Sequence, residues 1–428
     1  MLNLALITLG KAISELIQIF DLGNGSTWPG HIALKINKHF LREVVEKSKL
    51  KIILVAGTNG KTTTTALIRS ALEENGKTVL QNQSGANLLN GIASTLIMNT
   101  NVMGQLKQNF ALFEVDENAL PLILKELTPD YIVLLNLFRD QLDRYGEVNT
   151  IAENWKKSLT HLSSHSALIL NADDPQIAYL GEAMKARAVY FGLRDSQFTT
   201  DTSQRAADSI YCPKCGERLA FKAIAFSHLG DWECKYCGLK RPKIEDRKFT
   251  IYPLPGLYNK YNILASLQLL KQVGLTEEEI EESFIKFKPA FGRQEIVEYK
   301  KRKVQLFLSK NPTSFNQSYE TIKSLNATTL LLVLNDRVPD GHDVSWIWDA
   351  DLPGIKSFKH VLISGDRAYD MALRVKYEGA KNFQTFEDLK EAINTGIGLV
   401  EREETLFILP NYSAMLESRK ILTGRKIL

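Results

Sequence analysis

Short runs of apolar residues alternate with polar or helix-like sequence from Lys51 onwards. Five of these runs are KIILVA (51–56), FALFEV (110–115), YIVLLNL (131–137), SALILN (166–171) and AVYFG (188–192). Nearly continuous apolar strands of this kind are typical of a parallel sheet that is covered on both faces. The pattern therefore predicts an α/β fold with a central parallel sheet.

The same alternation resumes beyond Arg293. The runs there are VQLFL (304–308), TLLLVL (329–334), HVLI (360–363) and TLFIL (405–409), with helices expected near 313–325, 366–377 and 386–399. The segment 251–290 is expected to be helical. We therefore expect three parts: an N-terminal helix and loop segment (1–48), a central domain (49–300) with an insertion at about 200–247, and a smaller C-terminal α/β domain (301–428).

Composition narrows the class of protein. The chain has 428 residues, 44% apolar and 24% charged, which suits two or three globular domains. A net charge of +4 does not support a nucleic-acid partner. No apolar run reaches the roughly 20 residues of a transmembrane segment, and the apolar N-terminus, interrupted by Lys11 and Glu15, lacks the features of a signal peptide. We expect a cytoplasmic protein whose N-terminal helix packs on the rest of the chain, with membrane contact as the alternative.

A glycine-rich loop lies between a predicted strand and a predicted helix in ILVAGTNGKTTTTALI (53–68). Backbone N–H groups in such a loop, together with the helix N-terminus, bind phosphate. Lys61 would reach the outer phosphates, and the Thr62 hydroxyl would ligate Mg²⁺. Val55 departs from the general motif, because it stands where the first glycine would be. We predict a nucleotide site formed by Gly57, Thr58, Asn59, Gly60, Lys61, Thr62 and Thr63.

A carboxylate is needed beside this loop, because Mg²⁺ prefers oxygen ligands and usually takes one or two from the protein. Glu114, near the end of the run FALFEV, is the best candidate. Asp116 and Glu117 follow it closely and are alternatives. Each of the three could instead be a solvated charge or a helix cap.

All four cysteines of the chain belong to two CxxC motifs, Cys212/Cys215 and Cys234/Cys237, and each motif is followed by glycine. Four thiolates at this spacing complete a tetrahedral Zn²⁺ shell, and the glycine permits the tight turn that each motif requires. Four sulfur ligands leave no open coordination position. We therefore predict a zinc ribbon with a structural role, in which His228, between the motifs, is not a ligand.

The segment DGHDVSWIWDADLPG (340–354) concentrates two tryptophans and four aspartates. Alternation over 344–349 predicts a short strand or an extended segment. In one interpretation, Trp346 and Trp348 pack on the core and the aspartates lie at loop ends. In the other, the segment is an exposed aromatic surface that presents a carboxylate to the histidine of a partner protein.

Six segments, in this order, resemble motifs of the Mur ligase family, the ATP-dependent amide-forming enzymes of peptidoglycan synthesis and folate polyglutamylation. They are AGTNGKTT (56–63), FEVDE (113–117), NLFRDQLDRYG (136–146), LNADDP (170–175), PGLYNKYNILAS (255–266) and FGRQE (291–295). The resemblance implies a Mur-ligase-type central ATPase domain in which the loop and Glu114 hold Mg²⁺ and ATP. It also implies that Asn259 and Asn262 lie near the adenine and that Arg293 approaches phosphate.

Three features depart from the usual pattern of the family. The segment 1–48 is too short for the UDP-binding domain of members that use UDP-linked substrates. Gln141 replaces a histidine that usually ligates a second metal, and either Lys156 or Lys157 falls near the position of a carbamylated lysine that often shares this metal. LSKNPTSFNQ (308–317) lacks the aspartate and histidine that help to bind an incoming amino acid.

Further segments are similar to one amidotransferase branch of the family. They are LNDRVPDGHDVSWIWD (334–349), SGDRAYDMALRVKYEG (364–379) and ILPNYSAML (408–416), in addition to the zinc ribbon. In that branch, a ligase-like subunit forms a heterodimer with a GatD-like glutaminase subunit. The aspartate corresponding to Asp349 completes the glutaminase's Cys–His pair across the interface.

This resemblance implies amidation of the α-carboxyl of D-glutamate in the stem peptide of lipid II, at the inner face of the cell membrane. ATP would activate the carboxyl as an acyl phosphate, and ammonia from the partner would give D-isoglutamine. Lys61 and Glu114 would act in the ATP-dependent step and Asp349 in ammonia supply. Two alternatives stay open: a ligase that joins an amino acid to a carboxylate, as folylpolyglutamate synthase does, and a nucleotide-gated zinc-ribbon binding protein.

Overall fold

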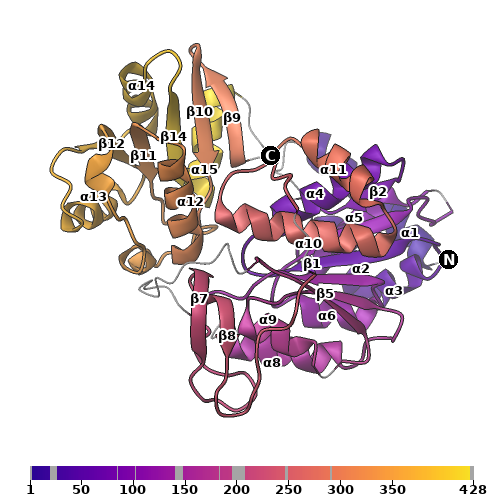
Figure 1. Ribbon diagram of the computed structural model, residues 1–428. Helices are drawn as coiled ribbons and strands as arrows, with labels where there is room; N and C mark the ends of the chain where they lie inside the picture. The colour runs from indigo at the N-terminus through magenta and orange to yellow at the C-terminus, as the bar shows by residue number, and fades with distance from the viewer. Residues whose placement is uncertain are drawn as a thin grey trace.

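Two α/β domains and a small β-hairpin make up the chain (Figure 1). The computed structural model describes residues 2–19, 27–83, 85–101, 103–139, 148–182, 184–194, 208–245, 249–289 and 292–424. The larger domain, on the right in Figure 1, carries the N-terminus, and the C-terminal domain lies at the upper left. The hairpin lies below them, beside the junction of the two domains.

The central sheet has six parallel strands in the order β2-β3-β1-β4-β5-β6. The strands are β1 (Lys51–Ala56), β2 (Val79–Gln81), β3 (Phe110–Val115), β4 (Tyr131–Leu134), β5 (Ala167–Asn171) and β6 (Arg187–Phe191). Each of the five predicted runs contains one strand, which confirms the parallel α/β prediction. The sixth strand, β2, has only three residues and carries too short a pattern to be recognised.

Both faces of this sheet are covered, which explains why its strands are mostly apolar. Ile53 and Val55 belong to the apolar core on one face, and Ile52 and Leu54 belong to the core on the other. The first core receives α4 (Lys61–Glu74), α10 (Leu257–Val273) and α11 (Glu277–Ile285). The second receives α2 (Trp28–Ile36), α3 (Phe40–Val45), α5 (Leu89–Asn99), α6 (Leu120–Glu126), α8 (Val148–Leu159) and α9 (Pro175–Leu180).

The N-terminal helix α1 (Leu2–Ile19) packs on the central domain with one face. Leu6 and Ile7 are buried there, and a Cβ added to Gly10 would lie 2.9 Å from the side chain of Ile97, so α1 packs tightly against α5 at this glycine. Packing of this helix is therefore as predicted. Outside this buried face, however, Leu2, Leu9 and Leu16 are exposed. Among the described residues, no helix has both the length and the apolar character needed to cross a membrane.

The C-terminal domain contains a second six-stranded sheet, in the order β13-β12-β11-β14-β10-β9. Its elements are β9 (Arg293–Tyr299), β10 (Arg302–Phe307), α12 (Pro312–Ser324), β11 (Thr329–Val333), β12 (His360–Ser364), α13 (Ala368–Tyr377), β13 (Gln384–Thr385), α14 (Leu389–Leu399), β14 (Thr405–Pro410) and α15 (Tyr412–Thr423). The expected strands and helices of this region are present. Strand β9 pairs antiparallel with β10, so the C-terminal sheet begins at Arg293, within the segment that the sequence assigned to the central domain.

The insertion folds as an antiparallel hairpin, β7 (Ala220–Phe226) and β8 (Leu229–Glu233), joined to the cysteine-bearing loops. Two hydrogen bonds tie β8 to the chain that follows β5. Gly230 N–H donates to the Asp173 carbonyl at 3.0 Å, and the Trp232 indole N–H donates to the Ala172 carbonyl at 3.1 Å. The hairpin is therefore fixed to the central domain.

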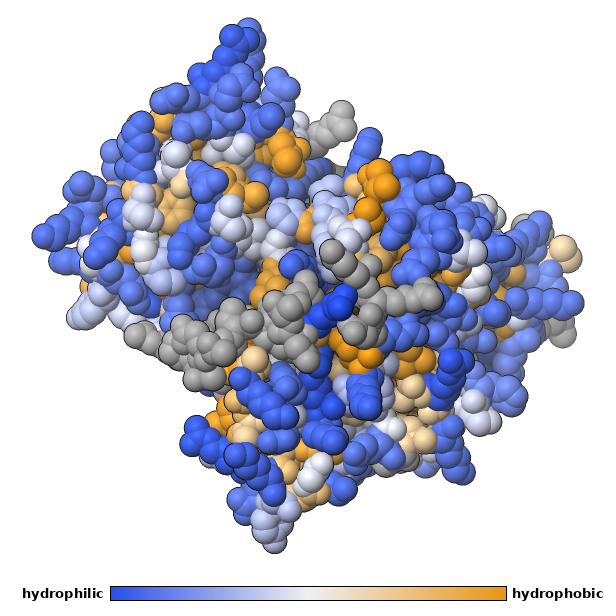
Figure 2. Space-filling view, in the orientation of Figure 1, coloured by the Kyte–Doolittle hydropathy of each residue, from blue (hydrophilic) through white to orange (hydrophobic). Residues whose placement is uncertain are grey.

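The face of the molecule in Figure 2 is predominantly hydrophilic. Hydrophobic side chains visible on it gather mainly around the junction between the central and C-terminal domains. That junction contains the two cavities in which the candidate site lies.

Candidate active site and metal centre

Strand β1 leads through the glycine-rich loop into α4, as the sequence predicts. Gly57 and Gly60 have φ angles of 144° and 92°, and Gly60 is the N-cap of α4. A Cβ on Gly60 would lie 2.1 Å from Oδ1 of Asn262, so only glycine fits between the loop and α10. Asn136, after β4, accepts the Asn59 N–H on its side-chain oxygen at 2.9 Å. This arrangement fixes the loop and leaves the N-terminus of α4 without a side-chain cap, as a phosphate site requires.

Lys61 is buried, and its ammonium is held by three oxygen atoms of the protein. It donates to the carbonyls of Gly57 and Thr58 and lies 3.2 Å from a carboxylate oxygen of Glu117. A phosphate group that binds the loop would therefore compete with these oxygens for the lysine.

Thr62 and Glu114 face each other across the loop. The Thr62 hydroxyl donates to Oε2 of Glu114 at 2.9 Å, because the parallel register places Glu114 beside Val55 at the end of β1. Both residues line the same cavity. Their oxygen atoms are the hard ligands that Mg²⁺ prefers, so the pair is suited to hold this ion.

The three candidate carboxylates have different environments. Burial, followed by the neighbouring Glu117, raises the pKa of Asp116 above its ordinary value. Burial acts in the same direction on Glu117, but Lys61 and then Lys310 outweigh it, so the pKa of Glu117 is lowered. Glu117 therefore remains charged as the partner of Lys61. Glu114 is the carboxylate that faces Thr62.

Residues 58–62 of the loop, together with Glu114 and Asp116, border a cavity of about 330 Å³ between the two domains. The C-terminal domain contributes charged and aromatic side chains to its wall, namely Arg293, Lys310, Asp340, Trp346 and Tyr412. Burial lowers the pKa of the Arg293 guanidinium from its ordinary value, opposed by the nearby Glu114. Five of the predicted loop residues (58–62), Glu114 and Arg293 are thus brought together around one space.

A second, narrow cavity of about 50 Å³ lies on the other side of Gly60. It shares Asn59, Gly60 and Arg293 with the first cavity. Further lining residues are Thr63, Asn259 and Asn262 of the central domain, Phe226 and Leu229 of the hairpin, and Thr313 and Gln317 of α12. The hairpin that carries the zinc motifs therefore supplies part of this wall.

Asn259 and Asn262 line this narrow cavity, but they also support the backbone. The side-chain amide of Asn259 donates to the Pro255 carbonyl at 2.7 Å, and that of Asn262 donates to Asn259 at 3.1 Å. Asn262 also packs against Gly60. Both residues therefore line a cavity beside the phosphate loop, and their hydrogen bonds add a supporting role.

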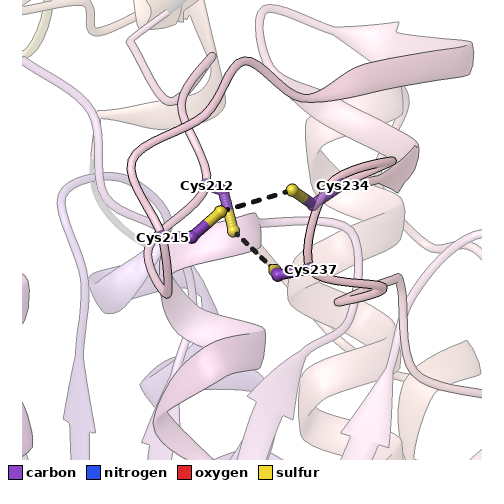
Figure 3. A group of neighbouring side chains, drawn as sticks. All are labelled: Cys212, Cys215, Cys234 and Cys237. Carbon is purple, nitrogen blue, oxygen red and sulfur yellow. Dashed lines mark hydrogen bonds between the residues drawn. The ribbon is translucent and has the colours of Figure 1, made fainter.

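The four cysteines form a compact cluster (Figure 3). Their sulfur atoms all lie within 4.8 Å of one another, with separations of 3.6 Å for Cys212 and Cys237 and 3.5 Å for Cys215 and Cys234. Four sulfurs around a tetrahedral Zn²⁺ are about 3.8 Å apart for Zn–S bonds of about 2.3 Å. The donor set therefore fits zinc. His228 is buried elsewhere, 3.4 Å from Asp174.

The tryptophan segment corrects one prediction. Residues Ser345–Trp348 form a 3-10 helix, η2, not a strand. Trp346 lies against Phe315, with ring centroids 5.9 Å apart, and lines the larger cavity. Trp348 is exposed and lies 5.6 Å from the ring of Tyr377. Trp346 therefore fits the interpretation in which the tryptophans pack on the core, and Trp348 fits the one in which they are exposed. Asp349, which ends η2, is also exposed.

Several residues of the site were missed because their role depends on tertiary contacts. Asn136 and Asn311 contact Asn59 from distant parts of the chain. The only local signals of these roles in the sequence are that Asn136 follows a predicted strand and that Asn311 precedes Pro312. Gln141 lies outside the described residues. Lys156 donates to Tyr179, and neither Lys156 nor Lys157 lines the larger cavity.

Two family models match this chain. The Mur ligase middle domain matches residues 55–270, and the MurT ligase C-terminal domain matches residues 308–415. Together they cover the phosphate loop, the hairpin insertion and most of the C-terminal domain.

Two similar proteins are bacterial subunits named lipid II isoglutaminyl synthase (glutamine-hydrolyzing) subunit MurT. The one from Staphylococcus aureus (strain COL) is 33% identical over 82% of this chain and 83% of its own length. The one from Streptococcus pneumoniae (strain ATCC BAA-255 / R6) is 32% identical over 95% of this chain and 94% of its own length.

Solved structures share the fold at lower identity. A pseudomurein peptide ligase type C from Methanothermus fervidus has a TM-score of 0.65 at 21% identity, covering 88% of this chain and 79% of that one. MurF ligase from Thermotoga maritima in complex with ADP has a TM-score of 0.65 at 16% identity, covering 91% and 83%. The chain therefore belongs to the Mur ligase family, and within it to the MurT branch.

Proposed function

We propose that this chain is the synthetase subunit of a glutamine-dependent amidotransferase that amidates lipid II. The α-carboxyl of D-glutamate in the stem peptide would attack the γ-phosphorus of ATP, giving an acyl phosphate and ADP. Ammonia would then form the C–N bond, with phosphate leaving and one proton released, to give D-isoglutamine. Phosphorylation is needed because phosphate is a far better leaving group than oxide. The names of the two similar MurT subunits support this substrate and reaction.

One observation carries the proposal. Trp346 lines the cavity beside the phosphate loop, and Asp349 ends the same short 3-10 helix on the exposed side. A carboxylate that serves a glutaminase therefore lies three residues from the wall of the cavity in which a carboxyl would be activated. This proximity suits an enzyme that receives ammonia from a partner.

Nucleotide would bind across both cavities. The base would lie in the narrow one, beside Asn259 and Asn262, and the phosphates at residues 57–63 and Arg293. A volume of about 50 Å³ is far below that of typical ligand pockets, about 300 Å³ or more, so the two domains must separate for the base to enter. Mg²⁺ held by Thr62 and Glu114 would neutralise charge on the phosphates. Lys61 would leave Glu117 to stabilise the transferring phosphoryl group.

The surface around Asp349 fits a protein partner. Trp348, Tyr369, Leu373 and Tyr377 are exposed large side chains on η2 and on α13, which packs beside it. Arg374 is buried and donates to the carbonyls of Ile347 and Ala350, so the backbone on both sides of Asp349 is held by α13. A preformed aromatic surface with a fixed carboxylate suits docking of a glutaminase subunit whose histidine Asp349 would orient.

The larger cavity also permits the alternative function, a ligase that joins an amino acid to a carboxylate. Lys310 lines it and is a cation that could receive the carboxylate of an incoming amino acid. Asn311 caps α12 and contacts Asn59, so it is engaged in joining the domains. The alternative therefore rests on Lys310 alone.

Action at the cytoplasmic face of the membrane would follow from a lipid-linked substrate. Helix α1 supports this location. Leu2, Leu9 and Leu16 are exposed and follow one another at intervals of seven residues, so they lie on one face of the helix. An apolar stripe of this kind suits shallow contact with a lipid surface.

The test supplies purified chain with Mg²⁺, ATP, lipid II and ammonium chloride, and follows the stem peptide by mass spectrometry. Conversion of carboxyl to amide lowers the mass by about one unit, and it should occur without a partner. A parallel reaction replaces ammonium with free amino acids. Incorporation of an amino acid, with no amide formed from ammonia, would support the conventional ligase in its place.

A further inference from the structure

Gln294 has an unusual environment directly after Arg293. It adopts a φ angle of 61°, which is uncommon for a residue other than glycine, and is only 3% exposed. Its side-chain nitrogen donates to the Pro255 carbonyl at 3.0 Å and to the Tyr258 hydroxyl at 2.7 Å. Its side-chain oxygen has no hydrogen-bond partner within the described part of the chain.

The orientation of this amide follows from its neighbours. A backbone carbonyl can only accept a hydrogen bond, so the group that faces Pro255 must be the NH₂. Rotating the amide by 180° would place Oε1 against the Pro255 carbonyl, so two acceptors would meet and that hydrogen bond would be lost. Oε1 is therefore the atom left without a partner. A buried acceptor that is unsatisfied costs free energy, and such atoms are rare in proteins.

The residue that carries the unsatisfied oxygen borders the narrow cavity. Gln294 lines it together with Asn59 and Gly60 of the phosphate loop. Arg293, the preceding residue, lines both cavities. A nucleotide whose phosphates lie at the loop would therefore extend its base toward Gln294. The strained backbone at Gln294 also agrees with a functional position, because strain of this kind is concentrated at ligand sites.

We propose that Oε1 of Gln294 accepts a hydrogen bond from the exocyclic amine of the nucleotide base, and that this contact selects a 6-aminopurine. The proposal rests on the nucleotide function given above and specifies how its base is recognised. A 6-oxopurine would bring a carbonyl oxygen toward Oε1, so two acceptors would meet. A purine without a 6-substituent would leave Oε1 unsatisfied but would not repel it.

The test measures the affinity of the wild-type chain, by calorimetry with Mg²⁺, for three triphosphates: ATP, purine riboside triphosphate and GTP. One neutral hydrogen bond corresponds to a preference for ATP over purine riboside triphosphate of roughly 3- to 10-fold. GTP should bind more weakly than both. Equal affinities for ATP and purine riboside triphosphate would overturn the proposal without any variant.

Gln294→Met keeps the length of the side chain and removes the acceptor. It should reduce the preference for ATP over purine riboside triphosphate to less than about twofold. Gln268→Met is the matched control, because Gln268 is also buried with an unsatisfied Oε1 but does not line the narrow cavity. It should keep the wild-type preference.

The outcomes distinguish the role of Gln294 from the proposed function of the chain. An unchanged preference in Gln294→Met would overturn the role of Gln294 and leave nucleotide binding intact. Failure of every triphosphate to bind the wild-type chain would overturn the proposed function itself.

Discussion

Phe138 and Phe226 stack with their ring centroids 6.1 Å apart and their planes 26° from parallel. Phe138 follows strand β4 of the central domain, whereas Phe226 ends strand β7 of the hairpin that is joined to the cysteine-bearing loops. Phe226 also contacts Tyr261 of α10, edge to face, at 5.7 Å. Both phenylalanines line the narrow cavity. Aromatic contacts thus pack the insertion into the wall of the narrow cavity, so it is more than a surface attachment.

Phe226→Ala should weaken ATP binding about tenfold, which corresponds to about 1.4 kcal/mol, because it removes part of the wall and its stacking partner. Titration calorimetry with ATP measures the effect, and a thermal melt of the same sample reports folding. Phe221→Ala is the control, since Phe221 lies on the same hairpin but does not line the cavity. Equal loss of affinity in both variants would mean that the hairpin acts only through stability.

Removal of zinc also tests whether the hairpin contributes to ATP binding. The purified chain should contain one zinc ion per molecule, and four thiolates should become reactive to a thiol reagent when a chelator removes it. The metal-free chain should melt at a lower temperature and bind ATP several-fold more weakly, because the hairpin is held by the loops that carry the cysteines. Cys212→Ser should behave in the same way. Metal-free chain with unchanged ATP affinity would contradict this connection.

The sequence predicts those parts of the site that are local in the chain. The phosphate loop needs glycine at Gly57 and Gly60, and the zinc motifs need cysteines at fixed spacing, so both are visible without a structure. Strands β1 and β3 are equally visible, because burial on both faces leaves them almost entirely apolar, with Lys51 and Glu114 as the exceptions. These features follow from short-range chemistry.

What the sequence does not predict depends on contacts between distant residues. Asn59 and Asn311 lie 252 positions apart and meet at the domain junction. The alternation around Trp346 resembles a strand, but a 3-10 helix forms because Asp343 accepts the Ser345 N–H at its start and Arg374 binds the Ile347 carbonyl. The role of Gln294 is likewise not visible in the sequence, because the orientation of its side-chain amide depends on the distant carbonyl of Pro255.

Glu114 and Glu117 should respond differently to loss of charge. Glu114→Gln should raise the Mg²⁺ concentration needed for half-maximal amidation by at least about tenfold, because Glu114 faces Thr62. Glu117→Gln should leave the Mg²⁺ requirement close to that of the wild type, since Glu117 pairs with Lys61 instead. Steady-state rates at varied Mg²⁺ measure both. A larger Mg²⁺ effect in Glu117→Gln would reverse the assignment of the two carboxylates.

The exposed stripe of α1 should mediate contact with lipid. Sedimentation with phosphatidylglycerol vesicles should recover the wild-type chain, and the double variant Leu9→Glu, Leu16→Glu should reduce recovery several-fold by placing charge on the apolar face. Leu373→Glu is a matched control, because Leu373 is a comparably exposed leucine of the C-terminal domain. Similar recovery of all three proteins would argue against a role of α1 at the membrane.

Asp349→Asn should separate the two halves of the reaction. The variant keeps its shape but cannot stabilise a protonated histidine of the partner, so amidation driven by glutamine should fall by roughly 10⁴-fold. Amidation driven by ammonium chloride should stay within about twofold of the wild type, because Asp349 does not line the larger cavity beside the phosphate loop. Asp343→Asn is the control: the asparagine side-chain oxygen can accept the Ser345 N–H as Asp343 does, and both reactions should persist. If Asp349→Asn slowed both reactions equally, the carboxylate would act on the ligase site or its folding and would have no specific role in ammonia supply.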